Sequence, residues 1–249
     1  DVSVTISIGI GSDQGSYVKN LDAARICIDL ALGRGGDQIV VKQRDSIQYF
    51  GGKTQGVEKN TKVKARFKAH ALHEFMSVSE KVVVMGHRLI DVDAFGAAIG
   101  IFRAAHTMNK KVHIVVDHVS SSLEPFVGAF RNNSSYDDKL IVSCDEAKEL
   151  VDEKTMLVVV DTSRPGYTGC EELLSMTRNI VVLDHHRQSS DVIRNSMLTY
   201  IEPYASSACE MVTEILQYFT DDIKLKNIEA DVLYAGMVVD TDNFMQKTG

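Results

Sequence analysis

The sequence predicts an α/β protein: a doubly wound, mostly parallel sheet preceded by a partial α+β segment. Short, wholly apolar runs recur beyond residue 80, among them Val82–Met85, Met156–Val160 and Ile180–Leu183. Such runs are typical of parallel strands that helices cover on both faces. Stretches with helical spacing, such as Asp93–Met108, separate the runs, and this alternation favours parallel strands joined by helices over residues 81–249.

The first 52 residues contain too little structure for a domain of their own. Residues 2–11 alternate between apolar and polar side chains, as in a strand with one buried face. Asp22–Leu32 has helical spacing and ends at glycines, and Ile39–Val41 with Ile47–Phe50 fits a small hairpin. We expect residues 1–52 to be the C-terminal part of a larger domain, and the chain to be an excerpt of a longer protein.

Residues 53–80 join the two regions and begin with a basic stretch. Its charged residues are Lys53, Glu58, Lys59, Lys62, Lys64, Arg66 and Lys68. We interpret this stretch as a solvated linker leading into an amphipathic helix over Val63–Val78, with a phosphate-contacting surface as the alternative.

Composition and charge limit the classes of protein that fit. The chain has 249 residues, 44% hydrophobic, and a net charge of −7, which argues against an extended basic surface for duplex nucleic acid. No apolar run approaches the roughly 18–20 residues of a membrane span. The four cysteines are widely spaced, and we expect buried thiols in a reducing cytosol and no disulfide.

Acidic and imidazole side chains follow the apolar runs one after another. The residues in these positions are His87, Asp91, Asp93, Asp161, Asp184, His185, His186 and Asp240. A single aspartate at a strand end is usually a helix N-cap, and a single histidine there is usually structural. Because the carboxyl ends of parallel strands meet at one edge of a sheet, we expect four separate segments to bring these groups together.

Four carboxylates crowded into one place need compensating positive charge. Asp91, Asp93, Asp161 and Asp240 would carry a charge of about −4, which two divalent cations would neutralise. Carboxylate and imidazole ligands without a thiolate favour Mn²⁺ or a related ion over structural zinc. Two such ions held close together support in-line attack at phosphorus, so the pattern predicts hydrolysis of a phosphoester or phosphoanhydride.

The same residues resemble the motifs of the DHH phosphoesterase superfamily. The matching positions are His87-x3-Asp91-x-Asp93, Asp161, Asp184-His185-His186 and Asp240. Further segments are similar to the cyclic-di-AMP phosphodiesterase branch (GdpP/YybT): ALGRGGDQIVVK from Ala31, DVDAFGAAIGIFRAA from Asp91, VVVDTSRPGYT from Val158, EPYASSACE from Glu202 and AGMVVDTDNF from Ala235. In that branch a degenerate GGDEF domain precedes the DHH domain, so residues 1–52 would be the end of the GGDEF domain.

The resemblance also implies a role for each site residue. One Mn²⁺ would be held by His87, Asp91 and Asp161. The other would be held by Asp93, Asp161, His185 and Asp240, so that Asp161 bridges the two ions. Asp184 would orient a neighbouring imidazole. His186 would donate to a phosphate oxygen, and Arg164 is a second candidate for that contact.

By this resemblance the parent protein is a bacterial Mn²⁺-dependent phosphodiesterase that hydrolyses cyclic-di-AMP to linear pApA by two-metal activation of water. The resemblance also implies a following DHHA1 domain, a homodimer, and upstream membrane helices and a PAS domain, with the catalytic part facing the cytoplasm. Two alternatives stay open. One is an exonuclease or nanoRNA phosphodiesterase that uses the same metals, and the other is a non-catalytic nucleotide-signalling module.

Overall fold

The structure is a computed structural model that describes residues 6–33, 38–44, 46–51, 57–187 and 190–245, with the side chains of 51–63 left out. It divides into a smaller unit, which includes residues up to Val63, and a larger unit of Lys64–Asn243. Within the described residues, no helix combines the length and the hydrophobicity that crossing a membrane requires.

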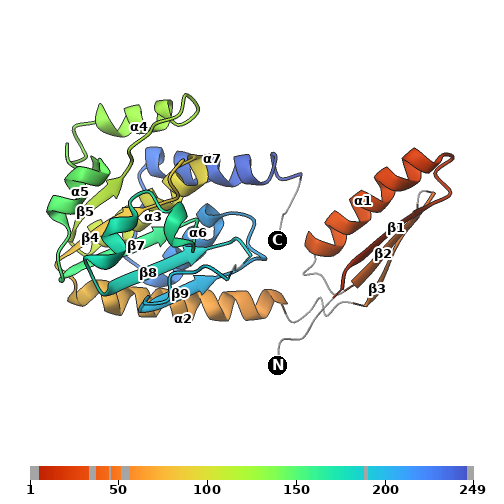
Figure 1. Ribbon diagram of the computed structural model, residues 1–249, viewed down its shortest axis with the longest axis horizontal. Coiled ribbons are helices and arrows are strands. Elements are labelled where there is room, and N and C mark those ends of the chain that lie inside the picture. The colour runs from red at the N-terminus through yellow and green to blue at the C-terminus, as the bar shows by residue number, and fades with distance from the viewer. Residues whose placement is uncertain (1–5, 34–37, 45, 52–56, 188–189, 246–249) are drawn as a thin grey trace. The chain divides into compact units, whose positions relative to one another are not determined.

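The smaller unit is a three-stranded sheet with one helix against it (Figure 1). Its elements are β1 (Ile8–Ser12), α1 (Tyr17–Gly33), β2 (Gln38–Gln43) and β3 (Ser46–Gly51). The strand β2 lies in the centre, parallel to β1 and antiparallel to β3, which confirms the predicted hairpin. Among the described residues, its buried cluster consists of Cys27, Ala31 and Val40.

The larger unit is built on a six-stranded, all-parallel sheet in the order β6-β5-β4-β7-β8-β9. The strands are β4 (Lys81–Met85), β5 (Lys111–Val115), β6 (Ile141–Val142), β7 (Thr155–Val160), β8 (Asn179–Asp184) and β9 (Leu198–Ile201). The helices are α2 (Val57–Val78), α3 (Val92–Thr107), α4 (Glu124–Arg131), α5 (Cys144–Leu150), α6 (Ala208–Phe219) and α7 (Asn227–Asp240), with 3-10 turns η1 (Pro165–Tyr167) and η2 (Glu171–Ser175). This architecture confirms the predicted fold class.

Successive residues of the central strands face opposite sides of the sheet, and both sides are covered. Val82 and Val84 of β4 belong to the large core beneath α2, α3, α6 and α7. Val83 and Met85 belong to a second core with α5 and η2. Because both sets are buried, these strands read as continuous apolar runs and not as alternating patterns.

The helices α3 and α7 pack antiparallel and very closely. A side chain at Gly96 would meet the Val232 carbonyl oxygen at 2.8 Å, and one at Gly236 would lie 3.0 Å from the Cα of Asp93. At the other end of the pair, the Arg103 guanidinium donates to the buried Glu229 carboxylate. The same two helices therefore carry a buried ion pair at one end and two of the expected site residues, Asp93 and Asp240, at the other.

Several elements differ from the prediction. The helix α2 begins at Val57 and not at Val63, and the division between the two units falls within it. Two of its basic residues hold it beside β9, because Lys64 pairs with Glu202 at 3.3 Å and Lys68 donates to the Thr199 carbonyl at 2.8 Å. Lys53 and the side chains of Lys59 and Lys62 lie outside the described residues.

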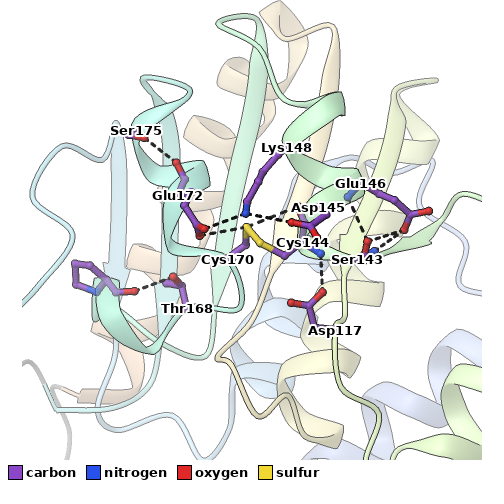
Figure 2. Close-up of a disulfide and its surroundings, with 11 residues drawn as sticks. Asp117, Ser143, Cys144, Asp145, Glu146, Lys148, Thr168, Cys170, Glu172 and Ser175 are labelled. Atoms are coloured by element: carbon purple, nitrogen blue, oxygen red, sulfur yellow. Dashed lines mark hydrogen bonds and ion pairs between the residues drawn. A yellow bond between two sulfur atoms is a disulfide. The ribbon is translucent and has the colours of Figure 1, made fainter.

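The prediction of four unpaired cysteines is wrong for two of them. Cys144 and Cys170 form a disulfide with a Cα–Cα distance of 5.4 Å, across 26 residues of sequence (Figure 2). Cys27 and Cys209 are free and buried, as expected. Wide spacing in the sequence did not reveal the pair, because β6 and the segment after β7 meet only in the folded sheet.

Candidate metal centre

The site lies where β4, β7 and β8 end (Figure 1). His87 follows β4 by two residues, Asp161 follows β7 directly, and Asp184 is the last residue of β8. Asp93 lies in the first turn of α3, and Asp240 is the last residue of α7. Strands and helices far apart in sequence thus deliver their polar ends to one edge of the sheet, as parallel topology requires.

His87, Asp91 and Asp161 form the first group of candidate ligands. His87 Nε2 lies 3.5 Å from Asp91 Oδ2 and 3.4 Å from Asp161 Oδ2. Asp91 is also the N-cap of α3, where Oδ1 accepts a hydrogen bond from the Ala94 amide at 3.0 Å. The hydrogen bonds to Asp161 and Asp91 raise the pKa of His87 to about 10, because these carboxylates stabilise the charged imidazolium.

Asp93, His185 and Asp240 form the second group. His185 Nε2 lies 3.9 Å from Asp93 Oδ2 and 3.4 Å from Asp240 Oδ2, and 3.1 Å from Asp161 Oδ1. Burial alone would lower the pKa of His185, but the contact with Asp161 and the charges of the surrounding carboxylates raise it to about 9. Within each of the two groups the ligand atoms lie within 4.8 Å of one another, close enough to share a cation.

The first turn of α6 holds Asp93 in place. The amide nitrogens of Ala208 and Cys209 donate to Asp93 Oδ2 and Oδ1 at 2.7 and 2.9 Å. Ser207 caps this helix by accepting a hydrogen bond from the Glu210 amide. Burial and the charge of Asp161 nevertheless raise the pKa of Asp93 to about 6, so the two amides do not compensate fully for the crowded negative charge.

Asp161 joins the two groups, and its environment fits a bound cation. Its backbone has φ 60°, an unusual conformation for a residue with a side chain. Its side chain is buried, and Oδ1 has no hydrogen-bond partner among the described residues, although His185 Nε2 lies 3.1 Å away as an ion-pair contact. A buried carboxylate oxygen normally has such a partner. A set of carboxylate oxygens and imidazole nitrogens in this place suits a divalent metal ion.

Asp184 and His186 pair beside these two groups, and His186 Nδ1 also lies 3.6 Å from Asp161 Oδ1. His186 Nδ1 lies 2.8 Å from Asp184 Oδ1, and the His186 backbone amide donates to the same oxygen at 3.0 Å. This contact with Asp184 raises the pKa of His186. Asp184 is buried while the His186 side chain is 60% exposed, so the imidazole is fixed at one nitrogen and open on its other side.

Arg164, the other expected phosphate contact, lies over an aromatic ring. Its guanidinium carbon is 4.1 Å from the centroid of Tyr167. The structure therefore brings His87, Asp91, Asp93, Asp161, His185 and Asp240 together, with Asp184 and His186 beside them, and places Arg164 against Tyr167.

Sequence reasoning missed two features that support the site. One is the pair of α6 amides on Asp93, because a backbone donor leaves no trace in residue type. The other is the segment Tyr167–Gly169, which pairs with the residues around His87. The apolar stretch before Asp240 is the last part of the helix α7 and not a strand, and the repeated small residues Ala235 and Gly236 are the signal that a close helix contact leaves.

Residues 81–237 match "DHH family, N-terminal domain", and residues 1–49 match "Cyclic-di-AMP phosphodiesterase GdpP-like, GGDEF domain". The whole chain is 41% identical to cyclic-di-AMP phosphodiesterase GdpP of Bacillus subtilis (strain 168) and 42% identical to cyclic-di-AMP phosphodiesterase PdeA of Listeria monocytogenes serotype 1/2a (strain 10403S). The chain spans 38% of the length of each of these relatives.

Among solved structures, the chain is similar to an exopolyphosphatase-related protein from Bacteroides fragilis. The TM-score is 0.58 at 21% identity, and the match covers 73% of this chain and 52% of that one. At this level of identity the likeness supports the fold.

Proposed function

The chain belongs to the DHH family, and from that premise we propose that it carries the metal centre of a phosphodiesterase that hydrolyses cyclic-di-AMP to linear pApA. The observation that carries the proposal is the meeting of two ligand groups at Asp161, on the carboxyl edge of a parallel sheet. The names of the two relatives that match over the whole chain support the substrate.

We propose that two Mn²⁺ ions bind the two ligand groups. His87, Asp91 and Asp161 would hold one, and Asp93, Asp161, His185 and Asp240 would hold the other. Bound there, divalent ions supply Lewis acidity toward a phosphoryl oxygen and lower the pKa of water. Asp161 then has one oxygen toward each group, since Oδ2 lies near His87 and Oδ1 near His185.

His186 is suited to hold the substrate's phosphate. Its Nδ1 is occupied by Asp184, and this contact favours the charged imidazolium. The exposed Nε2 can therefore donate to a phosphoryl oxygen on which negative charge develops. Asp184 fixes the ring and the proton on Nδ1, and this is the orienting role expected for it. Arg164 stays a second candidate for phosphate contact, with its guanidinium supported by Tyr167.

The overall reaction consumes one water. A phosphorus–oxygen bond of the cyclic dinucleotide breaks, the released sugar oxygen takes a proton from that water, and the remaining hydroxyl stays on phosphorus. The residues of this chain would promote the reaction in two ways. They orient the phosphate, and they hold the charged aspartate and histidine side chains at one edge of the sheet. Pre-organised charge of this kind commonly supplies a large part of the rate enhancement.

We propose three parts in the chain: residues 1–52 as the end of a degenerate GGDEF domain, 53–80 as a linker and helix, and 81–249 as the DHH domain. The chain spans 38% of the length of each of these two relatives. We propose that further segments of the longer protein complete the site, among them a DHHA1 domain that contacts the nucleobase. We also propose that the longer protein is a homodimer anchored in the membrane with this part in the cytoplasm.

The test uses the full-length protein that contains this chain. Purified wild type and Asp161→Asn are supplied with Mn²⁺ and either cyclic-di-AMP, pApA or a short oligoribonucleotide, and the products are separated by chromatography. We expect Mn²⁺-dependent conversion of cyclic-di-AMP to pApA by the wild type alone. Preferential cleavage of the oligoribonucleotide would favour the nanoRNA alternative, and binding of cyclic-di-AMP without turnover would favour the signalling alternative.

A further inference from the structure

A short backbone segment beside the metal centre holds His87 in place. We call Tyr167–Gly169 the strap. Thr168 forms an isolated antiparallel bridge with His87. On either side of it, the Arg88 amide donates to the Tyr167 carbonyl at 2.7 Å, and the Gly169 amide donates to the Gly86 carbonyl at 2.9 Å. The loop that presents His87 is therefore tied to the strap on both sides of the ligand.

The disulfide follows the strap directly. Cys170 is joined to Cys144, the first residue of α5, and the Cys144 amide donates to Asp117 Oδ1 at 2.6 Å (Figure 2). The helix α5 packs against the second core through Ala147. A covalent bond thus connects the end of the strap to a fixed part of the sheet's outer layer.

An ion pair also joins α5 to the segment after the strap, and it is weaker than the disulfide. Lys148 Nζ pairs with Glu172 Oε1 at 2.9 Å, and Figure 2 shows this pair beside the disulfide. The two side chains are 33% and 61% exposed, and ion pairs at such positions stabilise a fold by about 0–1 kcal/mol. The disulfide is therefore the stronger of the two restraints on the strap.

The disulfide also lies beside open space. Cys170 lines a hollow of about 890 Å³ together with Arg88, Thr168 and Glu172. Cys170 itself is buried, so a small thiol would approach its sulfur from this hollow, which Thr168 of the strap also lines.

We propose that the Cys144–Cys170 disulfide is a reversible redox link, the substrate of low-molecular-weight thiols, whose opening loosens the strap and weakens metal binding at His87. The effect on metal rests on the proposed function, whereas the opening of the disulfide and the loosening of the strap do not. The thiol pair is a modification site, and the strap residues act on the metal only by positioning His87.

The chemistry is thiol–disulfide exchange. A thiolate of the small thiol attacks one protein sulfur, the Cys144–Cys170 bond breaks, and a mixed disulfide forms. A second thiolate attacks the mixed disulfide and leaves as the oxidised small-molecule disulfide. The two electrons reside on the two protein sulfurs, which take up two protons to become thiols.

The first test uses the metal-free protein and measures the state of the disulfide and the strap. Free thiols are counted after denaturation, before and after incubation with glutathione, and amide hydrogen exchange is measured in both states. We expect two free thiols before reduction, from Cys27 and Cys209, and four after it. Exchange at the Arg88 and Gly169 amides should become at least about tenfold faster. The Asp161 amide, bonded to the Leu183 carbonyl at 2.8 Å, should keep its rate.

The second test measures Mn²⁺ binding. Mn²⁺ is titrated calorimetrically into both forms, and we expect reduction to weaken binding roughly tenfold, as losses of supporting contacts around metal ligands do. Cys144→Ser should resemble the reduced wild type and should not respond to glutathione. Lys148→Ala, which removes only the ion pair with Glu172, should keep the disulfide and bind Mn²⁺ like the wild type.

The outcomes separate the two proposals. Four free thiols in protein kept under air, or equal exchange at Arg88 and Gly169 in both forms, would overturn the redox link. If reduction accelerates amide exchange but neither the oxidised nor the reduced protein binds Mn²⁺, the redox link is supported and the proposed metal centre is overturned. Equal Mn²⁺ affinity in both forms, with faster exchange, would overturn the coupling between the strap and the metal.

Discussion

The two edges of the six-stranded sheet differ in the cationic partners of their carboxylates. At the edge where strands begin, carboxylates pair with lysines: Asp152 lies 2.8 Å from Lys81, and Glu80 lies 2.5 Å from Lys154. At the edge where the strands end, every ion pair within the described cluster involves a histidine. Five aspartates share three histidines there. These residues are His87, Asp91, Asp93, Asp161, Asp184, His185, His186 and Asp240.

The helix layer repeats the contrast. Where α3 ends and α7 begins, Arg103 and Tyr136 satisfy the Glu229 carboxylate, which is buried. At the opposite end of the same helices, Asp93 and Asp240 have His185 between them. This fold can bury a carboxylate beside a permanently charged arginine, whereas the aspartates of the cluster pair with histidines, an arrangement that suits a candidate metal site.

The largest expected effect comes from removing the shared carboxylate charge. Asparagine at position 161 tolerates the left-handed backbone, so Asp161→Asn should fold. We expect Mn²⁺-dependent turnover in the full-length protein to fall roughly 10³-fold, as it does when a main catalytic group is lost. Steady-state kinetics measure this, and Lys154→Gln at the opposite edge is the control that should retain full activity.

At the Arg103–Glu229 ion pair, we expect a substitution to lower the stability of the fold strongly and to change metal binding little. Arg103→Met leaves the Glu229 carboxylate buried without its guanidinium, with the Tyr136 hydroxyl and the Lys226 amide as remaining partners, which should cost about 3–5 kcal/mol. Urea denaturation of the metal-free protein measures the cost. The double variant Arg103→Met/Glu229→Leu should recover most of it, and a double variant as unstable as the single one would show that the ion pair is not the source.

An intermediate effect is expected at the cap of α6. Ser207→Ala removes the hydroxyl that accepts from the Glu210 amide at 3.0 Å, and loss of an N-cap costs about 1 kcal/mol. Because the next two amides hold Asp93, we also expect Mn²⁺ to bind a few-fold more weakly. Ser207→Thr keeps a capping hydroxyl and should restore both quantities, as thermal melts and calorimetry can check.

The smallest effect belongs to the strand-start edge and depends on pH. The ion pair with Lys81 and the Thr155 hydroxyl lower the pKa of Asp152 from 3.8 to about 2. A depressed carboxyl pKa stabilises the fold above the unfolded value and loses this effect as pH falls through the folded value. Asp152→Asn should therefore lower the melting temperature at about pH 7, with the difference shrinking toward about pH 2. A pH-independent difference would contradict this.

Much of the sheet follows from the sequence because doubly buried strands leave apolar runs, as β4 and β7 do. The cluster could be anticipated because Asp161 and Asp184 stand at the ends of such runs. The disulfide, the strap and the α6 amides on Asp93 could not. Each depends on backbone positions or on pairings that only the packed sheet creates, and the spacing of Cys144 and Cys170 carries no sign of them.

Anomalous scattering from crystals soaked in Mn²⁺ tests the central claim most directly. Two peaks are predicted, one beside His87 and one beside His185, with the Asp161 carboxylate in contact with both, and none at the matched Arg103–Glu229 end. A density map without peaks at this edge of the sheet, at saturating Mn²⁺, would contradict the account.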